Sequence, residues 1–142
     1  MINVAKILHF ADIHFDTPFT ARFSKDEAAG ARLQLRDVFS KIIEEADLII
    51  TGEGKIDRQS LMGKVVSGVL AQAQIRDIPV LAICGKVEDA EILMSYSSLM
   101  AIFPIYDETL SLKQNMQTDI ALRNLKHTIH SELPKYLKTT IL

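Results

Sequence analysis

The chain has 142 residues, of which 48% are hydrophobic and 24% are charged, and its formal net charge is -2. This length suits one domain with a sizeable core. The small charge and the scattered Lys and Arg exclude the electrostatic footprint of a nucleic-acid or anionic-membrane partner. No apolar run approaches the roughly 20 residues that span a bilayer, and the single cysteine, Cys84, cannot form an internal disulfide. We therefore expect a cytoplasmic protein with neither nucleic acid nor membrane as a partner.

Apolar patterning in the first half of the chain predicts two strands and one helix. Residues 7–11 form an apolar run too short for a helix and bounded by Asp12, as in a buried strand. A polar stretch follows, to about Gly30. Spacings of three and four then predict a helix over residues 32–46. Its core face carries Leu35, Val38, Phe39, Ile42, Ile43 and Ala46. Residues 47–51 predict a second strand, which we expect to stop at Gly52-Glu53-Gly54.

The second half of the chain continues this alternation. A helix is predicted to begin near Ser60, with Asp57 or Ser60 as its cap, and to bury Leu61, Val65, Val69 and Ala73. Residues 78–84 predict a strand ended by Gly85, residues 88–96 a short helix, and residues 100–103 a strand stopped by Pro104. The last helix has the clearest stripe, and Pro134 should kink it or end its regular part. The stripe consists of Leu122, Leu125, Ile129, Leu133 and Leu137.

Strands that alternate with helices along a chain favour a parallel sheet with helices on both faces. The strand runs are continuously apolar, as burial on both faces requires. We therefore predict one α/β domain over residues 1–142. It should have three layers and a mainly parallel sheet of about four strands, in a Rossmann-like or flavodoxin-like arrangement.

The segment after the first strand, Asp12-Ile13-His14, carries a carboxylate and an imidazole one residue apart. At the carboxyl end of a strand both side chains can face one crevice, and such ligands suit Mn, Zn or Fe. The alternative interpretation is an Asp that caps a turn beside a solvated His.

Residues 7–19 read ILHFADIHFDTPF and precede a helix that contains Arg32 and Arg36. On these features, residues 4–46 resemble the N-terminus of the DNA-repair exonuclease branch of the calcineurin-like metallophosphoesterases. The resemblance implies metal-ligand roles for Asp12 and His14. The later Gly-Asp, Gly-Asn-His and Gly-His-x-His motifs of that family have no counterpart here. Because two ligands cannot hold two metal ions, we expect a vestigial metal site and no nuclease activity.

Residues 51–57 read Thr-Gly-Glu-Gly-Lys-Ile-Asp and lead through Gly63-Lys64 into a helix. On this motif, and on residues 78–85 and 101–105, residues 46–137 resemble the C-terminal region of bacterial glycerate kinases. Lys55 stands where that family usually has Arg. The resemblance implies a phosphate or substrate site near the motif.

The motif also has a direct physical interpretation. Gly52 and Gly54 would let the backbone turn sharply and bring N–H groups close to an anion at a helix N-terminus. Glu53 and Asp57 could hold Mg through water, while basic side chains contact a phosphate or an organic acid. The alternative is a simple turn with solvated charges. The candidate phosphate- or substrate-binding residues, which we regard as vestigial, are Gly52, Glu53, Gly54, Lys55, Asp57 and Lys64.

The two resemblances meet at residues 46–52. We interpret the chain as a chimera, engineered or produced by gene fusion, in which segments 1–46 and 47–142 share one sheet. Each piece lacks most of its parent's active site. We therefore expect no evolved catalytic function and no cofactor beyond a divalent ion such as Mg or Mn. One alternative is a truncated glycerate kinase-like ATP-dependent phosphotransferase, and another is a residual metal-dependent phosphoesterase. Apolar surface exposed by the missing parent segments predicts a homo-oligomer.

Overall fold

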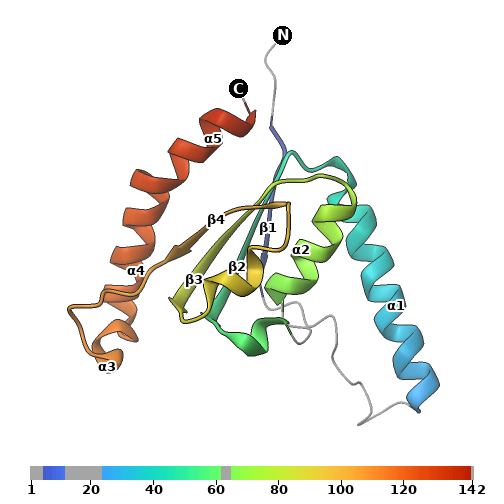
Figure 1. Ribbon diagram of the computed structural model, residues 1–142, viewed down its shortest axis with the longest axis horizontal. Helices are drawn as coiled ribbons and strands as arrows, with labels where there is room; N and C mark the ends of the chain where they lie inside the picture. The colour runs from blue at the N-terminus through green and yellow to red at the C-terminus, as the bar shows by residue number, and fades with distance from the viewer. Residues whose placement is uncertain (1–4, 12–23, 62–64, 142) are drawn as a thin grey trace.

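The computed structural model describes residues 5–11, 24–61 and 65–141, and these build a four-stranded sheet with helices on both sides (Figure 1). No helix in these ranges is long and apolar enough to cross a membrane. The strands are β1 (Ile7–Ala11), β2 (Leu48–Ile56), β3 (Val80–Val87) and β4 (Leu99–Pro104). The α-helices are α1 (Lys25–Ile42), α2 (Val65–Ile75), α3 (Leu112–Asn115), α4 (Thr118–His127) and α5 (Leu133–Ile141). The 3-10 turns are η1 (Ile43–Glu45), η2 (Arg58–Leu61) and η3 (Ala90–Leu93).

All three strand pairings are parallel, and the strand order is β1-β2-β3-β4. This confirms the predicted α/β class with one parallel sheet of four strands. The order follows the chain without a reversal, whereas open α/β sheets bind ligands where the strand order reverses. The described sheet therefore has no such switch point, and any site at its carboxyl edge must be built from strand ends and loops.

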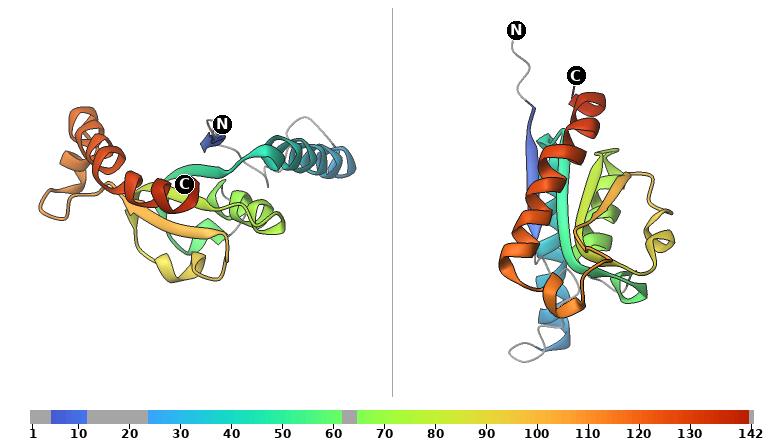
Figure 2. Two further views of the ribbon diagram at one scale, coloured as in Figure 1. Left: turned by 90° about the horizontal axis from the view of Figure 1, so that it is seen from above. Right: turned by 90° about the vertical axis from the view of Figure 1, so that its left-hand side faces the viewer.

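The helices divide between the two faces of the sheet (Figures 1 and 2). The first face is covered by α1, α2 and η3, whose buried side chains include Phe39, Val69 and Leu93. The second face is covered by the C-terminal helix, where Leu133 packs with Leu48 and Leu81. Because alternate residues of a strand point to opposite faces, β2 supplies Leu48 to the second core and Ile49 to the first.

Helix α1 begins earlier than the apolar pattern predicts, at Lys25. A capping box starts it: the Ser24 hydroxyl accepts from the Glu27 N–H, and the Glu27 carboxylate accepts from the Ser24 N–H. The predicted core face is partly wrong. Phe39 is buried and meets the Phe10 ring edge-on at 4.7 Å, but Val38 and Ile42 are 54% and 49% exposed. Val38 and Ile42 are four residues apart and share one line along the helix, beside the line of Phe39 and Ile43 that faces the core. The first turns of α1 extend past the sheet (Figure 1).

The predicted stop of the second strand at its glycines is wrong, because β2 continues through them to Ile56. The third strand likewise passes through Gly85 to Val87. The two strands stay paired beyond the glycines, with Lys55 opposite Lys86. A Cβ on Gly85 would overlap the Gly54 carbonyl oxygen, and one on Gly52 would lie 3.0 Å from the Ile83 carbonyl oxygen. Gly52 and Gly85 therefore allow the backbones of neighbouring strands to approach closely, and they do not form a turn.

Of the two helices predicted in the middle of the chain, the tertiary structure shortens one and keeps the core face of the other. The short helix predicted over residues 88–96 is reduced to the 3-10 turn η3. Its N-cap residue, Asp89, makes no side-chain capping bond, and the chain must soon return to β4, where the Ser98 carbonyl accepts from the Val80 N–H at 2.8 Å. In α2, the predicted core positions Val65, Val69 and Ala73 are buried.

The last helix loses its regular form just before Pro134, as predicted. Residues Thr128–Glu132 form a π-helical segment between α4 and α5, in which the Leu133 N–H donates to the Thr128 carbonyl. Proline has no N–H to donate to the carbonyl four residues before it and its ring crowds that carbonyl, so the widened turn relieves the clash. The predicted stripe is only partly buried. Leu133 is 7% exposed, but Leu122 and Ile129 are 47% and 41% exposed.

The contact between Gly54 and Gly85 predicts a large effect of one methyl group. We expect Gly85→Ala to destabilise the fold by about 2–3 kcal/mol, because backbone atoms must move to admit the Cβ. Gly30→Ala is the matched control. A Cβ at Gly30 meets nothing within 4 Å, and alanine inside a helix should stabilise it by about 0.5–1 kcal/mol. Urea unfolding of both variants measures the difference. Equal stabilities would contradict the packing argument.

Candidate functional site

The candidate site lies at the carboxyl ends of β2 and β3, where the structure brings several charged side chains together. Glu53 and Lys55 belong to β2, and Asp57 follows it directly. The Glu88 N–H donates to the Ile56 carbonyl at 2.9 Å, which extends the pairing of the two strand ends. Of the six candidate residues, four therefore lie on β2 and Asp57 lies directly after it.

Lys55 and Glu88 are the centre of a charge cluster at this edge. Lys55 Nζ lies 2.7 Å from Glu88 Oε2 and 3.5 Å from Asp57 Oδ2. Glu88 also meets a second ammonium, with Lys86 Nζ 3.7 Å from its Oε1. The hydrogen bond from Lys55 is the main reason that the pKa of Glu88 lies below its ordinary value. The reciprocal bond raises the pKa of Lys55, so Lys55 stays charged near neutral pH.

Ser60 holds Asp57 in place. The Asp57 N–H donates to Ser60 Oγ at 3.1 Å, and the Ser60 N–H donates to the Asp57 carbonyl at 2.8 Å. The Ser60 hydroxyl donates in turn to the Lys55 carbonyl at 3.4 Å, and its side chain is fully buried. The serine that the sequence suggested as a helix cap therefore closes the η2 turn after the strand.

Glu53 lies opposite Cys84 in the strand register. Burial, with a smaller contribution from the charge of Glu53, raises the pKa of the Cys84 thiol to about 12. The thiol is 3.9 Å from the Phe103 carbonyl oxygen. Cys84 is therefore a protonated core side chain and not a nucleophile of the site.

The anion-binding turn expected at Gly52 and Gly54 is not formed. This segment is extended and paired with β3, so its N–H groups do not converge on one point. The helix N-terminus expected next to the motif is replaced by the η2 turn. Any anion at this edge must therefore be held by side chains.

Three of the predicted site residues, Asp12, His14 and Lys64, lie outside the described residues. Among the residues that the structure describes, no group of three or more His, Cys, Asp or Glu side chains is arranged to hold a metal ion.

Lys86 and Glu88 belong to the charge cluster but were not predicted as site residues. Both follow the third apolar run directly, in Gly85-Lys86-Val87-Glu88. Since parallel strands end at the same edge of a sheet, charged residues after the third apolar run are expected beside those that follow the second. A strand that ends at Gly85, as the sequence predicts, leaves both residues outside the sheet, whereas β3 in fact continues to Val87.

Comparisons with known proteins show which family of sequences this chain is similar to. The sequence profile described as the Glycerate kinase family matches residues 28–133. A glycerate kinase of Neisseria meningitidis is 34% identical over 90 residues, which cover 63% of this chain and 24% of that protein. A glycerate kinase of Bacillus cereus is 39% identical over 90 residues, covering 63% and 23%. One of Haemophilus influenzae is 44% identical over 64 residues, covering 44% and 17%. The chain thus spans about a quarter or less of the length of these relatives.

The family match corrects the interpretation of the chain as a chimera. The matched range begins at residue 28, inside α1, and crosses residues 46–52 without a break. The supposed seam is therefore internal to one family, and none of these matches supports a phosphoesterase-like piece. Helix α1, assigned above to a phosphoesterase, belongs with the strands that follow it. The prediction of an artificial domain without evolved function is wrong.

The charge cluster predicts how the pKa of Glu88 responds to two substitutions. Lys55→Met should raise that pKa toward its ordinary value, because it removes the hydrogen bond and the nearer positive charge. Lys86→Met should raise it less, since that ammonium acts only through its charge. Carboxyl-carbon NMR titration of Glu88 in the two variants measures both pKa values. A larger rise in the Lys86 variant would contradict the assigned geometry.

The Cys84 environment predicts a slow reaction with alkylating agents. With a thiol pKa of about 12, only roughly one molecule in ten thousand is a thiolate at pH 8. We expect iodoacetamide to modify the folded protein at least about 100-fold more slowly than the urea-unfolded protein. Mass spectrometry of timed samples measures the ratio. Similar rates in the two states would show that the thiol is accessible.

Proposed function

This chain belongs to the glycerate kinase family, and we propose that it serves ATP-dependent phosphoryl transfer to glycerate by supplying one wall of the active-site cleft. The observation that carries the proposal is the position of the charge cluster. The matched range, residues 28–133, contains the whole cluster at the carboxyl ends of β2 and β3. The named relatives are glycerate kinases of greater length, so the opposite wall would come from polypeptide beyond this chain or from a second copy.

The cluster suits the electrostatics of phosphoryl transfer. The reaction is catalysed mainly by positioning the phosphates and by stabilising the charge that moves among their oxygens. Lys55 is held at a strand end by two carboxylates while its side chain stays 45% exposed. It is therefore both oriented and accessible. We propose that Lys55 contacts a phosphate oxygen, with Lys86 adding positive charge beside it and Lys64 acting from the segment before α2.

A divalent ion fits the acidic residues of this edge. Glu53 and Asp57 offer hard carboxylate oxygens, and Mg²⁺ in nucleotide sites is held by one or two carboxylates together with the phosphates. When bound, Mg²⁺ would neutralise part of the phosphate charge. The chain's own contribution is to fix Asp57 through the buried Ser60 and to keep Lys55 beside it.

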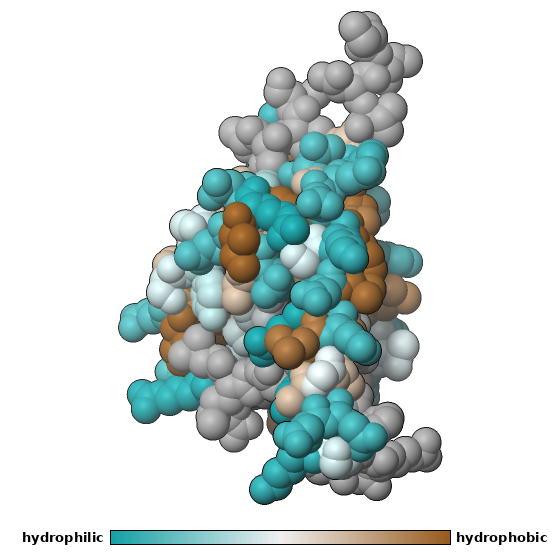
Figure 3. Space-filling model, turned by 90° about the vertical axis from the view of Figure 1, so that its right-hand side faces the viewer, coloured by the Kyte–Doolittle hydropathy of each residue, from teal (hydrophilic) through white to brown (hydrophobic). Residues whose placement is uncertain are grey.

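The exposed apolar side chains bear on how the cleft is completed. On the side of the molecule formed by α1, apolar side chains are exposed among hydrophilic ones (Figure 3). Leu33 is 62% exposed and Ile75 is 71% exposed. Such side chains offer contacts for further polypeptide, and we retain self-association of this chain as part of the proposal.

A two-step experiment tests the function. A coupled assay first measures ATP consumption by this chain with and without D-glycerate. Residues 28–133 then replace the matching segment of the Neisseria meningitidis glycerate kinase. We expect the graft to phosphorylate glycerate, and we expect Lys55→Ala in the graft to lower kcat/KM by roughly 100-fold, as for the loss of one charge-stabilising group.

The matched control for that graft is Lys41→Ala, which removes an exposed lysine from α1 and should leave kcat/KM unchanged. A graft that folds but transfers no phosphoryl group would refute the proposed function. A graft whose activity is unaffected by Lys55→Ala would refute the role of Lys55.

A further inference from the structure

A second concave site lies beside the charge cluster, at the carboxyl end of β4. It is a pocket of about 620 Å³ between residues 104–109 and the helix α4. Lys86 joins the two sites, because its ammonium lies 5.2 Å from the centre of the Tyr106 ring, and Tyr106 lines the pocket. The volume falls within the range of small-molecule sites.

Two asparagines fix the walls of the pocket. Asn124 of α4 donates from Nδ2 to the Ile105 carbonyl at 2.9 Å, which ties the helix to the segment after β4. Asn115 accepts the Asp107 N–H at 2.8 Å and donates to the Asp107 carbonyl at 2.9 Å. The segment that forms one wall is thus anchored at both ends, and the pocket does not depend on a free loop.

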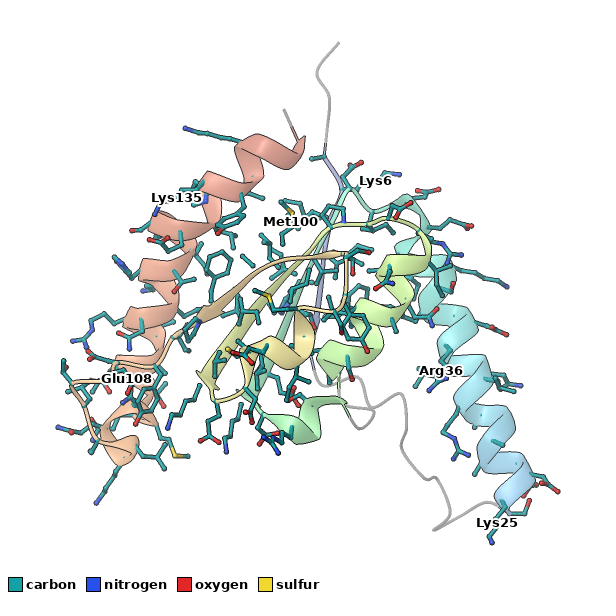
Figure 4. The ribbon with its side chains drawn as sticks, in the orientation of Figure 1. Lys6, Lys25, Arg36, Met100, Glu108 and Lys135 are labelled. Atoms are coloured by element: carbon teal, nitrogen blue, oxygen red, sulfur yellow. The ribbon has the colours of Figure 1, made fainter. Side chains whose placement is uncertain are left out.

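The lining carries charges of both signs. Arg123 and His127 are four residues apart, so they lie on the same face of α4. The positive charge of Arg123 contributes to lowering the pKa of Asp107, so a ligand carboxylate on this guanidinium would share it with that side chain. Asp107 and Glu108, which carry carboxylates, belong to the same lining (Glu108 is labelled in Figure 4). Asp107 Oδ1 accepts from the Thr109 N–H and hydroxyl at 2.9 and 2.6 Å, which fixes that carboxylate.

From this lining we infer that the pocket binds a small hydroxy carboxylate, with its carboxylate on Arg123 and its hydroxyl groups on the acidic wall. A guanidinium pairs with a carboxylate through two parallel hydrogen bonds. Carboxylates that accept hydrogen bonds select a ligand that also carries hydroxyl donors. The same two carboxylates repel a multiply charged phosphate group, which favours the singly charged acid.

This inference rests on the proposed function and deepens it, because glycerate is a hydroxy carboxylate. In the proposal the acid would sit at Arg123 while the phosphate lies toward Lys55, and the Lys86 and Tyr106 contact lies between the two sites. Arg123 is then a residue that binds the acceptor, and Asn124 is a positioning residue that acts through the Ile105 carbonyl.

Binding to the chain as it exists tests the inference without any need for turnover. NMR signals of Arg123 and His127 are followed while D-glycerate, propionate or inorganic phosphate is added separately. We expect saturable shifts with glycerate, and at least about fivefold weaker binding of propionate and of phosphate. Arg123→Ala should weaken glycerate binding at least about tenfold. Lys126→Ala, which removes a charge from the same helix outside the pocket lining, should leave it unchanged.

Glu108→Gln tests the acidic wall by itself, because it keeps the shape and removes the charge. We expect this variant to reduce the preference for glycerate over phosphate. Thermal unfolding of each variant checks that the fold persists. Tighter binding of phosphate than of glycerate, equal binding of propionate and glycerate, or an effect of Lys126→Ala as large as that of Arg123→Ala would each overturn the inference.

The two proposals fail in different ways. Glycerate binding by the chain together with an inactive graft would contradict only the proposed function. An active graft that retains its KM for glycerate after Arg123→Ala would contradict only the assignment of the pocket.

Discussion

The close backbone approach of β2 and β3 at Gly54 and Gly85 is the constraint on which the carboxyl edge of this protein depends. A side chain at Gly85 would overlap the Gly54 carbonyl, so the strands can stay paired as far as Lys55 and Lys86 only because position 85 is glycine. If the strands separated at the glycines, Lys55, Asp57 and Glu88 would stand on loops. Ordering these loops would cost conformational entropy. The weak ion pairs of a surface cluster could not offset that cost. The charge cluster therefore depends on the backbone contact between the two strands.

The charge cluster and the pocket at β4 are two parts of one edge. Lys55 is shared between Glu88 and Asp57, and Glu88 is shared between Lys55 and Lys86. Such surface pairs add little to folding stability, and their value here is orientation. In the proposed function a phosphate would be met by groups already in place, and a lysine held by carboxylates while half exposed is suited to that task. The contact between Lys86 and the Tyr106 ring links the cluster to the segment that follows β4.

The apparent seam at residues 46–52 shows how local patterns can mislead. A helix followed by an apolar strand and a glycine beside a carboxylate occurs in unrelated α/β proteins, because each βα unit meets the same requirements of burial and strand exit. The Asp12-Ile13-His14 segment gave the N-terminal part a second resemblance, but the family match runs through the supposed join from residue 28 to residue 133. Continuity across residues 46–52 was decisive, since a true fusion would interrupt a match to either parent there.

The α/β class, the parallel sheet of four strands, the burial of Val65, Val69 and Ala73, and the loss of helical regularity before Pro134 could all be predicted from the amino-acid sequence. Each of these follows from apolar runs, helical periodicity or the chemistry of proline, all of which act over a few residues. Lys55 and Asp57 are predicted as site residues from the motif of residues 51–57, and their role stays a prediction. The glycines continue β2 and β3 instead of ending them, and this could not be predicted from the sequence, because their role is set by contact between strands distant in sequence. The tertiary structure also leaves Val38, Ile42, Leu122 and Ile129 exposed, since a periodic face is buried only where the fold brings a partner to it. It likewise brings Lys86 and Glu88 close to Lys55.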